Sequence, residues 1–338
     1  MRQVWIARAG PPEVLEVREA PDPQPGPGQV RIRVAAAGVN FADILARLGL
    51  YPDAPPLPTV VGYEVAGTVD AVGPDVNTSA PGERVLALTR FGGYSDVVVV
   101  AAPQVFPIPS SLSFEQAATL PVNYLTAWIM LVHLGNVGAG QRVLVHSVGG
   151  GVGQAALQIC RWRGAEVIGT ASAAKHERLR AEGVAHVIDY TRGDFVPEVT
   201  RVTAGHGVDL VLDAVGGSSF HRSYRCLAPL GRLFCYGVSS FAPGKRRSLL
   251  ATLRGLAGMG AFFPLGLMNR NRGVIGLNVG HLWSEARLLR SFMEDIVKLA
   301  AEGVFHPVTD RSFAFDEASA AHAWIQDRKN FGKVLLVP

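Results

Sequence analysis

The order of apolar and polar positions predicts a β-rich region at the start of the chain. Residues 30–34 alternate apolar side chains with arginine, and residues 65–73 and 94–102 have the composition of further short strands. Proline and glycine are frequent between these runs, for example in residues 21–28. Because these residues favour turns, we expect residues 1 to about 110 to form an all-β lobe.

The pattern changes after about Gly138, where strand-like and helix-like runs alternate up to about Gly280. Strands that alternate with helices are typical of a parallel sheet with crossover helices on both faces. We therefore predict an α/β fold with a doubly wound, six-stranded parallel sheet of the Rossmann type. The predicted strands are residues 142–148, 166–170, 186–189, 208–213, 232–236 and 273–279.

Helix signals stand on both sides of this alternating region. Ser113 and Gln116 have the spacing of a capping box and predict a helix that runs to Pro121, which interrupts it. An apolar helix over residues 122–135 is expected to follow.

A second amphipathic helix is expected near the end of the chain, capped by Ser284 and extending through Glu302. After it we expect a short strand, a helix from Asp316 and a closing strand over residues 333–338. The apolar face of the capped helix is predicted to consist of Leu288, Leu289, Phe292, Ile296 and Leu299.

Residues 143–153, VLVHSVGGGVG, carry the strongest functional signal. A strand that turns on glycines into a helix places free backbone N–H groups and the positive end of a helix dipole where a pyrophosphate can bind. Gly150 is expected to allow the tight turn, Gly151 and Val152 the approach of the phosphates, and Gly153 the packing of helix on strand. Val148 replaces the first glycine of the usual dinucleotide-binding spacing.

The next strand indicates which dinucleotide is bound. NAD-binding proteins place an Asp or Glu at its end to bind the ribose, and no acid stands there in this chain. Ser172, Lys175 and Arg178 follow instead, and a hydroxyl with two cations suits a 2′-phosphate. These residues favour NADPH over NADH. The alternative is that Lys175 and Arg178 are ordinary solvated helix residues.

Composition excludes several other classes of protein. The chain has 338 residues with a hydrophobic fraction of 48% and 18% charged residues, which is typical of a globular protein of about two domains. The net charge is +4 and the longest basic run is residues 245–247, which falls short of a nucleic-acid-binding footprint. The first ten residues lack the apolar core of a signal peptide, so a cytoplasmic location is the default expectation.

Residues 248–268 fit the α/β plan poorly, because they are almost wholly apolar and follow the basic triplet 245–247. A lid over the substrate, a subunit contact, a membrane-touching loop within residues 244–268, and packing against its own chain all remain open. Apolar residues next to cations favour anionic lipid surfaces.

Several strings together resemble the medium-chain dehydrogenase/reductase superfamily and its zinc-free quinone oxidoreductase branch. They are VNFAD (39–43), RLGLYP (47–52), PTVVGYEVAGTV (58–69), LPVNYLTAW (120–128), VLVHSVGGGVG (143–153), TASAAKHERL (170–179), LDAVGG (212–217) and RKNFGKVLLVP (328–338). The run LAPLGRLFCYGVSSFAPGKRR, with NRGVIG further on, is similar to the vesicle amine transport protein group within that branch. The resemblance covers essentially the whole chain.

This resemblance implies a domain organisation and a set of site residues. A GroES-like catalytic domain is expected over residues 1–123, a Rossmann NADPH-binding domain over 124–280, and a return to the catalytic domain over 281–338. Relatives pair as dimers, so a homodimer through strand 273–279 is expected. The residues implied at the nicotinamide end of the site are Asn40, Tyr51 and Thr126, and further cofactor contacts are implied for Tyr190, Gly237 and Asn330.

The residues also indicate a metal-free site. Zinc alcohol dehydrogenases need a cysteine where Asn40 stands and a histidine where Tyr63 stands, and no cysteine precedes Cys160. Glu64 is therefore expected to be structural, paired with an arginine. The branch often has a tyrosine where Phe41 stands, so that hydroxyl is missing here.

The leading hypothesis is NADPH-dependent reduction of quinones or α,β-unsaturated carbonyls by hydride transfer. Asn40 would polarise the acceptor's carbonyl group, and Tyr51 would hydrogen-bond it or relay a proton. The alternatives are a turn residue for Asn40 and a core aromatic for Tyr51. A rival hypothesis is a lipid-binding or membrane-associated protein with weak or vestigial reductase activity.

Overall fold

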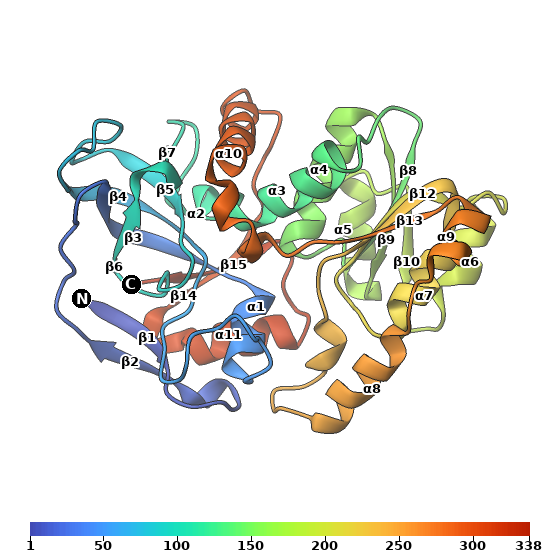
Figure 1. The fold of residues 1–338 in the computed structure, drawn as a ribbon, viewed down its shortest axis with the longest axis horizontal. Helices are drawn as coiled ribbons and strands as arrows, with labels where there is room; N and C mark the ends of the chain where they lie inside the picture. The colour runs from blue at the N-terminus through green and yellow to red at the C-terminus, as the bar shows by residue number, and fades with distance from the viewer. The chain divides into compact units, whose positions relative to one another are not determined.

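The computed structural model describes all residues from Met1 to Pro338. The chain forms two compact units. Unit 1 comprises Met1–Leu125, Gly244–Arg247 and Gly280–Pro338, and unit 2 comprises Thr126–Pro243 and Ser248–Val279. Both chain termini lie in unit 1 (Figure 1).

Unit 1 is built on a seven-stranded sheet in the order β14-β15-β3-β4-β5-β7, with β6 paired to β3, and a separate β1-β2 pair. Its strands are β1 (Arg2–Ile6), β2 (Leu15–Glu19), β3 (Gln29–Val39), β4 (Glu64–Val72), β5 (Arg84–Leu88), β6 (Val97–Ala101), β7 (Val105–Pro107), β14 (Thr309–Ala314) and β15 (Lys333–Val337). The strands expected near residues 30–34, 65–73 and 94–102 are therefore present.

Alternation along β3 explains its place in this sheet. Val30, Ile32 and Val34 point into the core, while Arg31 and Arg33 point outward and form ion pairs with Asp70. Because side chains of a strand alternate between faces, this pattern fixes which face of β3 is buried.

Unit 1 also contains helices, so its first 110 residues are not all β. Its helices are α1 (Phe41–Arg47), α2 (Phe114–Ala117), the start of α3 (Leu120–Trp128), α10 (Ala286–Ala301) and α11 (Ala318–Gln326), with 3-10 turns at Pro12–Val14, Ala102–Gln104, Val279–His281, Trp283–Glu285 and Phe315–Glu317. Ser113 caps α2 as predicted, since its Oγ accepts from the Gln116 N–H at 3.2 Å.

Two helix boundaries differ from the prediction. Pro121 does not interrupt a helix but lies in the first turn of α3, where its missing N–H costs nothing. Helix α10 begins at Ala286 after a 3-10 turn rather than at a Ser284 cap. On α10, Leu288 is 37% exposed, while Met293, which the prediction omitted, is buried.

Unit 2 has the predicted six-stranded parallel sheet, in the order β10-β9-β8-β11-β12-β13. The strands are β8 (Arg142–His146), β9 (Glu166–Ala171), β10 (His186–Asp189), β11 (Val208–Asp213), β12 (Leu227–Cys235) and β13 (Gly273–Gly276). Strand β12 begins five residues before the predicted residue 232, and β13 ends three before the predicted 279. The α/β fold class is confirmed.

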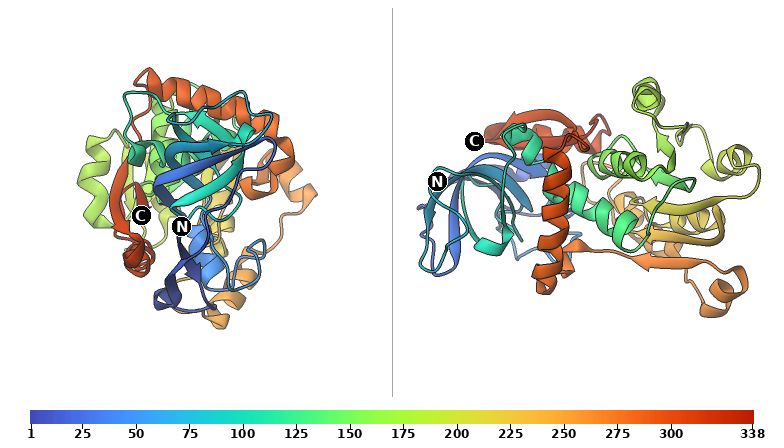
Figure 2. Two further views of the ribbon diagram at one scale, coloured as in Figure 1. Left: turned by 90° about the vertical axis from the view of Figure 1, so that its left-hand side faces the viewer. Right: turned by 90° about the horizontal axis from the view of Figure 1, so that it is seen from above.

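Helices lie on both sides of this sheet (Figure 2). They are the end of α3, α4 (Gly151–Arg163), α5 (His176–Ala181), α6 (Phe195–Val202), α7 (Ser218–Arg225), α8 (Leu249–Met259) and α9 (Pro264–Arg270), with a π-helical turn at Ile129–His133 and 3-10 turns at Ala173–Lys175 and Ser239–Phe241. Gly164 ends α4 in the left-handed conformation, with φ of 74°, which glycine adopts without strain.

The apolar residues 248–268 form α8 and most of α9. Gly255 of α8 is buried against Phe241, so one face of the helix packs on its own unit. The opposite face does not, because seven large apolar side chains are between 53% and 72% exposed: Leu249, Leu250, Leu253, Leu256, Phe263, Leu265 and Met268.

No single helix of the chain is long and apolar enough to cross a membrane. Helices α8 and α9 reach that length and hydropathy only as a pair, with a bend of 58° between them.

Candidate functional site

The glycine turn after β8 has the geometry of an anion site. Strand β8 ends at His146 and α4 begins at Gly151, with Gly150 as its N-cap and no side chain capping the helix. The first N–H groups of a helix have no partners within the helix, so this end can accept a phosphate. Gly150 has φ of −86° and ψ of 175°, which any residue adopts. The left-handed residue of the turn is Ser147, with φ of 55°, so the tight turn does not depend on Gly150 as predicted.

Two glycines let the turn, α4 and β9 approach closely. A Cβ atom on Gly153 would lie 2.6 Å from the Ser147 carbonyl oxygen and from the Val148 backbone. One on Gly169, within β9, would lie 2.5 Å from the Val148 side chain. The packing role predicted for Gly153 is therefore present, and Gly169, which the sequence analysis missed, has the same role.

The end of β9 holds two of the three residues expected at a 2′-phosphate. Ser172 directly follows the strand, and the half-buried Lys175 ends the next 3-10 turn. Arg178 lies one turn further on α5, where its Nε is 3.2 Å from Glu182 Oε1. Because this is an i,i+4 ion pair on an exposed helix face, Arg178 fits the solvated-residue alternative better than Lys175 does.

A buried polar network lies directly beneath the turn, and the sequence analysis did not foresee it. The two ring nitrogens of His146 are 3.1 Å from Thr170 Oγ1 and 2.9 Å from Ser223 Oγ. The hydroxyls of Ser223 and Ser219 donate to Asp213 Oδ2 at 2.7 and 2.8 Å. The network therefore ties β8, β9, β11 and α7 together.

The electrostatics of this network favour the neutral form of its histidine. Burial lowers the pKa of His146, and the nearby Asp213 carboxylate opposes that shift. Asp213 is itself satisfied, since its Oδ1 also accepts from the N–H groups of Val215 and Gly216 at 2.7 and 3.2 Å. A group so enclosed is better suited to hold the sheet edge rigid than to react.

The remaining expected cofactor residues lie at several places. Tyr190 follows β10, and Gly237 lies two residues beyond β12, where a Cβ would be 2.9 Å from the Ala214 carbonyl oxygen. Thr126 is buried in α3. Asn330, in unit 1, donates through Nδ2 to the Gly332 carbonyl at 3.1 Å.

Asn40 occupies an unusual place in unit 1. It is the N-cap residue of α1, but its side chain makes no capping bond. Instead the Asp43 carboxylate accepts from the Asn40 backbone N–H at 2.8 Å. The Asn40 side chain is thereby available for other bonds, and its Nδ2 donates to Glu64 Oε1 at 3.0 Å.

Glu64 is paired with Lys333 and not with an arginine, which corrects the prediction. Both side chains are buried, and the Lys333 ammonium contacts Glu64 Oε1. Lys333 also donates to Asn40 Oδ1 at 2.6 Å and to Asn123 Oδ1 at 3.4 Å. The other carboxylate oxygen of Glu64 accepts from the Val122 N–H at 2.7 Å.

Tyr51 lies at the edge of the unit 1 core. Its side chain is half-buried, and its ring meets that of Tyr63 edge to face with 6.4 Å between centroids. Tyr63 packs in turn on Phe91 at 5.3 Å. Burial raises the pKa of Tyr63, and the Asp43 carboxylate and the Tyr51 hydroxyl add to that shift. The contacts of Tyr51 therefore fit the packing alternative, and its side chain is only partly buried.

Metal ligands do not converge in this structure. No group of three or more His, Cys, Asp or Glu side chains is placed to hold a metal ion. The positions compared with zinc ligands hold the amide of Asn40 and the phenol of Tyr63, and the Lys333 cation sits beside Glu64. A divalent cation would meet a positive charge there.

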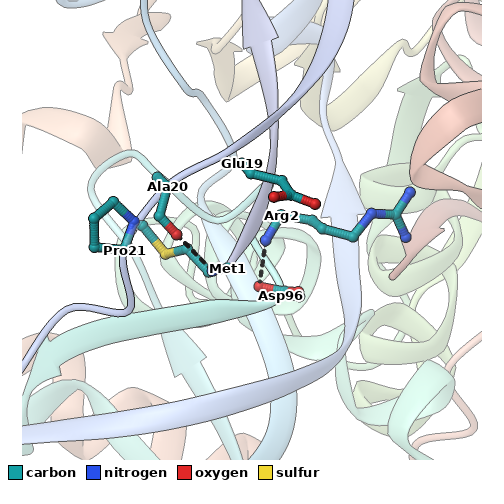
Figure 3. Close-up of a pocket in the computed structure, with 6 residues that line it drawn as sticks. All are labelled: Met1, Arg2, Glu19, Ala20, Pro21 and Asp96. Atoms are coloured by element: carbon teal, nitrogen blue, oxygen red, sulfur yellow. Dashed lines mark hydrogen bonds between the residues drawn. The ribbon is translucent and has the colours of Figure 1, made fainter.

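A cavity of about 490 Å³ lies elsewhere in unit 1, beside the chain's N-terminus (Figure 3). It is lined by Met1, Arg2, Glu19, Ala20, Pro21 and Asp96. Its polar groups already bond one another, since the Met1 amine donates to the Ala20 carbonyl at 2.6 Å and the Arg2 N–H to Asp96 at 2.9 Å. It contains none of the predicted site residues.

Two protein-family models match parts of this chain. A family model described as "Alcohol dehydrogenase GroES-like domain" matches residues 26–110, and one described as "Zinc-binding dehydrogenase" matches residues 182–336. The second description names a zinc-binding family, whereas this chain has no metal-binding cluster.

Individual relatives narrow the family further. The "Synaptic vesicle membrane protein VAT-1 homolog" of Mus musculus is 43% identical over 325 residues, which is 96% of this chain and 80% of the relative. The structure of the human VAT-1 homolog-like protein is 34% identical, with a TM-score of 0.86 over 100% of this chain and 98% of that one. Escherichia coli quinone oxidoreductase complexed with NADPH is 29% identical, with a TM-score of 0.88 and full coverage of both chains. This chain belongs to the medium-chain dehydrogenase/reductase superfamily, among the VAT-1 homologs and quinone oxidoreductase-like proteins.

Proposed function

We propose that the protein is a zinc-independent, NADPH-dependent reductase of quinones or α,β-unsaturated carbonyls. The observation that carries the proposal is the uncapped glycine turn at the N-terminus of α4, combined with the absence of an acid at the end of β9. The likeness to a quinone oxidoreductase complexed with NADPH supports the same cofactor and substrate class.

The residues of unit 2 fit a dinucleotide. The first N–H groups of α4 have no side-chain cap and would hold the pyrophosphate. Gly153 and Gly169 keep the turn close to the sheet, and a larger side chain at either would collide with it. Ser172 and Lys175 would hold the 2′-phosphate, because a hydroxyl and a cation bind a phosphate dianion together.

The residues of unit 1 have the chemistry to polarise and protonate an electrophilic acceptor. When bound, the reduced nicotinamide supplies a hydride, and the acceptor gains one proton to complete a two-electron reduction. The Asn40 amide would donate to the acceptor's carbonyl oxygen as negative charge develops on it. The hydroxyl of Tyr51, a half-buried residue, would deliver or relay the proton.

Two other aromatic residues in this part of the chain are less suited than Tyr51 to supply the proton. Phe41 offers no hydroxyl, and burial raises the pKa of Tyr63, which holds its proton. Water exclusion and alignment would then supply much of the remaining rate enhancement.

Cofactor-dependent turnover tests the proposal directly. The purified protein is incubated with NADPH or NADH and a panel of quinones and enones, and cofactor oxidation is followed at constant pH. We expect turnover with at least one acceptor class and a higher kcat/KM with NADPH. Tight NADPH binding without reduction of any acceptor would reject the reductase assignment.

A second candidate function is association with membranes, which the name of the relative from Mus musculus, a synaptic vesicle membrane protein homolog, also favours. The specific observation is the outer face of α8 and α9, where Leu253, Phe263 and Leu265 are 63% to 72% exposed. Exposed Arg254 and Arg270 lie on the same helices, and such a combination favours a lipid surface with negative charge.

Cosedimentation with vesicles separates the two functions. Wild type and the variant Leu253→Ser/Phe263→Ser are mixed with vesicles of zwitterionic lipid, with or without an anionic lipid. The membrane proposal expects wild type to sediment only with anionic vesicles and the variant to remain in solution. If wild type and variant stay in the supernatant in equal amounts with every kind of vesicle, the membrane proposal is wrong. That outcome would not bear on the proposed NADPH-dependent reduction.

Strand β13 also allows two copies of the chain to pair as a homodimer. Strand β13 is the last strand of the unit 2 sheet, so its outer edge lacks a partner strand in a single chain. Pairing of two such edges would extend the sheet across two subunits. Light scattering at several protein concentrations, compared with an Ile275→Pro variant, tests this proposal.

A further inference from the structure

We propose that Lys333 is a positioning residue: its ammonium group, held by Glu64, fixes the Asn40 amide so that one amide N–H is offered to the acceptor's carbonyl oxygen. The inference rests on the proposed function, since it explains how Asn40 would perform its role there. It uses only side chains of unit 1.

Two opposite charges determine the orientation of the Asn40 amide. Its Oδ1 lies 2.6 Å from the Lys333 ammonium, and its Nδ2 lies 3.0 Å from a Glu64 carboxylate oxygen. An amide oxygen only accepts and an amide NH₂ only donates. Rotating the amide by half a turn would place NH₂ against the ammonium and oxygen against the carboxylate. Both contacts would be repulsive, so a single orientation is selected.

The two charges act through Asn40 and not on a ligand. Lys333 and Glu64 are both buried. The three ammonium hydrogens face Glu64, Asn40 and Asn123, and the second Glu64 oxygen accepts from a backbone N–H of α3. Every ammonium hydrogen of Lys333 therefore has an acceptor, and both oxygens of the buried Glu64 carboxylate already accept hydrogen bonds. Lys333 is therefore not itself a catalytic residue.

One amide hydrogen of Asn40 remains for a ligand. The first points to Glu64, and the second makes a long hydrogen bond of 3.5 Å to the Gly38 carbonyl, which a ligand could replace. Asn40 is partly exposed, and the proposal requires this second hydrogen to reach the acceptor. A cation bonded to the amide oxygen withdraws electron density from the nitrogen, which strengthens the remaining N–H as a donor.

The test must not leave a buried charge without a partner. Lys333→Met alone would isolate the Glu64 carboxylate and is expected to destabilise the fold. The double variant Glu64→Gln/Lys333→Met removes both charges with little change in volume. We expect its kcat for quinone reduction to fall about tenfold to a hundredfold, with NADPH affinity unchanged within about twofold. Lys298→Met, on the exposed face of α10, is the matched control and should retain full kcat.

A mutant cycle with Asn40→Ala distinguishes positioning from general structural support. If the charge pair acts through the amide, Glu64→Gln/Lys333→Met causes no further loss of kcat once Asn40 is alanine. If the losses multiply, the pair supports activity independently of Asn40 and the inference is wrong.

A readout without turnover separates this inference from the proposed function. With asparagine labelled selectively by ¹⁵N, the side-chain NH₂ signals of Asn40 are assigned by their loss in Asn40→Ala. We expect two well-separated, slowly exchanging proton signals in the wild type, which move and exchange faster in Glu64→Gln/Lys333→Met. Identical Asn40 signals in both proteins would overturn the inference. Wild type that binds NADPH but reduces no acceptor would overturn the proposed function instead, whatever the signals show.

Discussion

The phenolic oxygen of Tyr94 lies 3.0 Å from Oδ2 of Asp43, and both side chains are wholly buried in unit 1. His322 completes the chain, with Nε2 at 3.1 Å from the same phenolic oxygen. Burial raises the pKa of Asp43 to about 7, against hydrogen bonds from the Asn40 N–H and the Tyr94 hydroxyl that lower it. Asp43 also accepts from the Asn40 N–H at the N-terminus of α1. Its protonation state therefore affects Asn40, the residue proposed to bind the acceptor.

Stability should therefore depend on pH through Asp43. Its pKa is 3.8 in an unfolded chain and about 7 when folded, so the folded state binds more protons between these values. The free energy of unfolding consequently falls as pH rises from about 4 to about 7 and is level above that, with a total change on the order of a few kcal/mol. Urea unfolding of wild type and Asp43→Asn across this range measures the difference.

The comparison with Asp43→Asn isolates this effect from the buried histidines. Burial lowers the pKa of both His146 and His322, so each makes stability rise with pH near their ordinary value of 6.5. Both histidines are retained in the variant. The wild type should lose stability relative to Asp43→Asn as pH rises, and parallel curves would contradict the prediction.

Gly153 is predicted to tolerate no side chain. A Cβ there would lie 2.6 Å from backbone atoms of Ser147 and Val148, which cannot move without displacing the turn. Gly153→Ala should lower the free energy of unfolding by about 1–3 kcal/mol and weaken NADPH binding. Gly138→Ala is the matched control, since nothing lies within 4 Å of its Cβ position. Equal stability of the two variants would show that the turn adapts.

Metal independence is a further prediction, because the Lys333 ammonium stands beside Glu64 and no cluster of metal ligands is present. Purified protein without a metal-binding tag should contain well under one zinc per chain, measured by elemental analysis. Treatment with a chelator should leave turnover unchanged. Loss of stoichiometric zinc together with activity would contradict this prediction.

The sequence predicted the parts of the fold that depend on local pattern. The six parallel strands of unit 2 are short apolar runs bounded by turn residues, and each was located to within a few residues. The capping box at Ser113 was found because its bonds join residues three apart. The start of helix α10 was predicted less accurately, since Ser284 lies within the 3-10 turn Trp283–Glu285 and no local signal distinguishes this turn from a first helical turn.

The polar clusters could not be predicted, because their members come from distant parts of the chain. Lys333 and Asn40 are 293 positions apart, and only the antiparallel pairing of β15 with β3 brings the two segments together. The one local clue was a lysine at the start of a strand that is otherwise apolar. His146 lies within a predicted strand, but no local pattern in the sequence indicated that it would contact Ser223 of α7.

Tyr51 is predicted to act on the acceptor through its hydroxyl. Tyr51→Phe keeps the ring against Tyr63 but removes the donor, so turnover should fall on the order of a hundredfold while NADPH affinity stays unchanged. Steady-state kinetics and cofactor titration measure the two effects. Tyr224→Phe, which removes a buried tyrosine hydroxyl in unit 2, is the control and should retain turnover. Unchanged turnover in Tyr51→Phe would reduce Tyr51 to a packing residue.

We predict that the choice of cofactor depends on Lys175, in the 3-10 turn that follows β9. A charge-assisted hydrogen bond to phosphate contributes roughly 1.5–3 kcal/mol, so Lys175→Ala should weaken NADPH binding by about tenfold to a hundredfold. NADH has no 2′-phosphate, and its affinity should barely change. Fluorescence titration of both cofactors against wild type and variant measures the difference.

Two arginine variants on the same helix sharpen this prediction. Arg178→Ala should weaken NADPH less than Lys175→Ala does, because Arg178 is held by Glu182. Arg180→Ala, an exposed residue two positions further, is the control and should leave both affinities unchanged. A selective loss of NADPH affinity in Lys175→Ala assigns the 2′-phosphate to this residue. Equal weakening of NADPH and NADH would instead mean that Lys175 supports the fold, and the preference for NADPH would lose its main support.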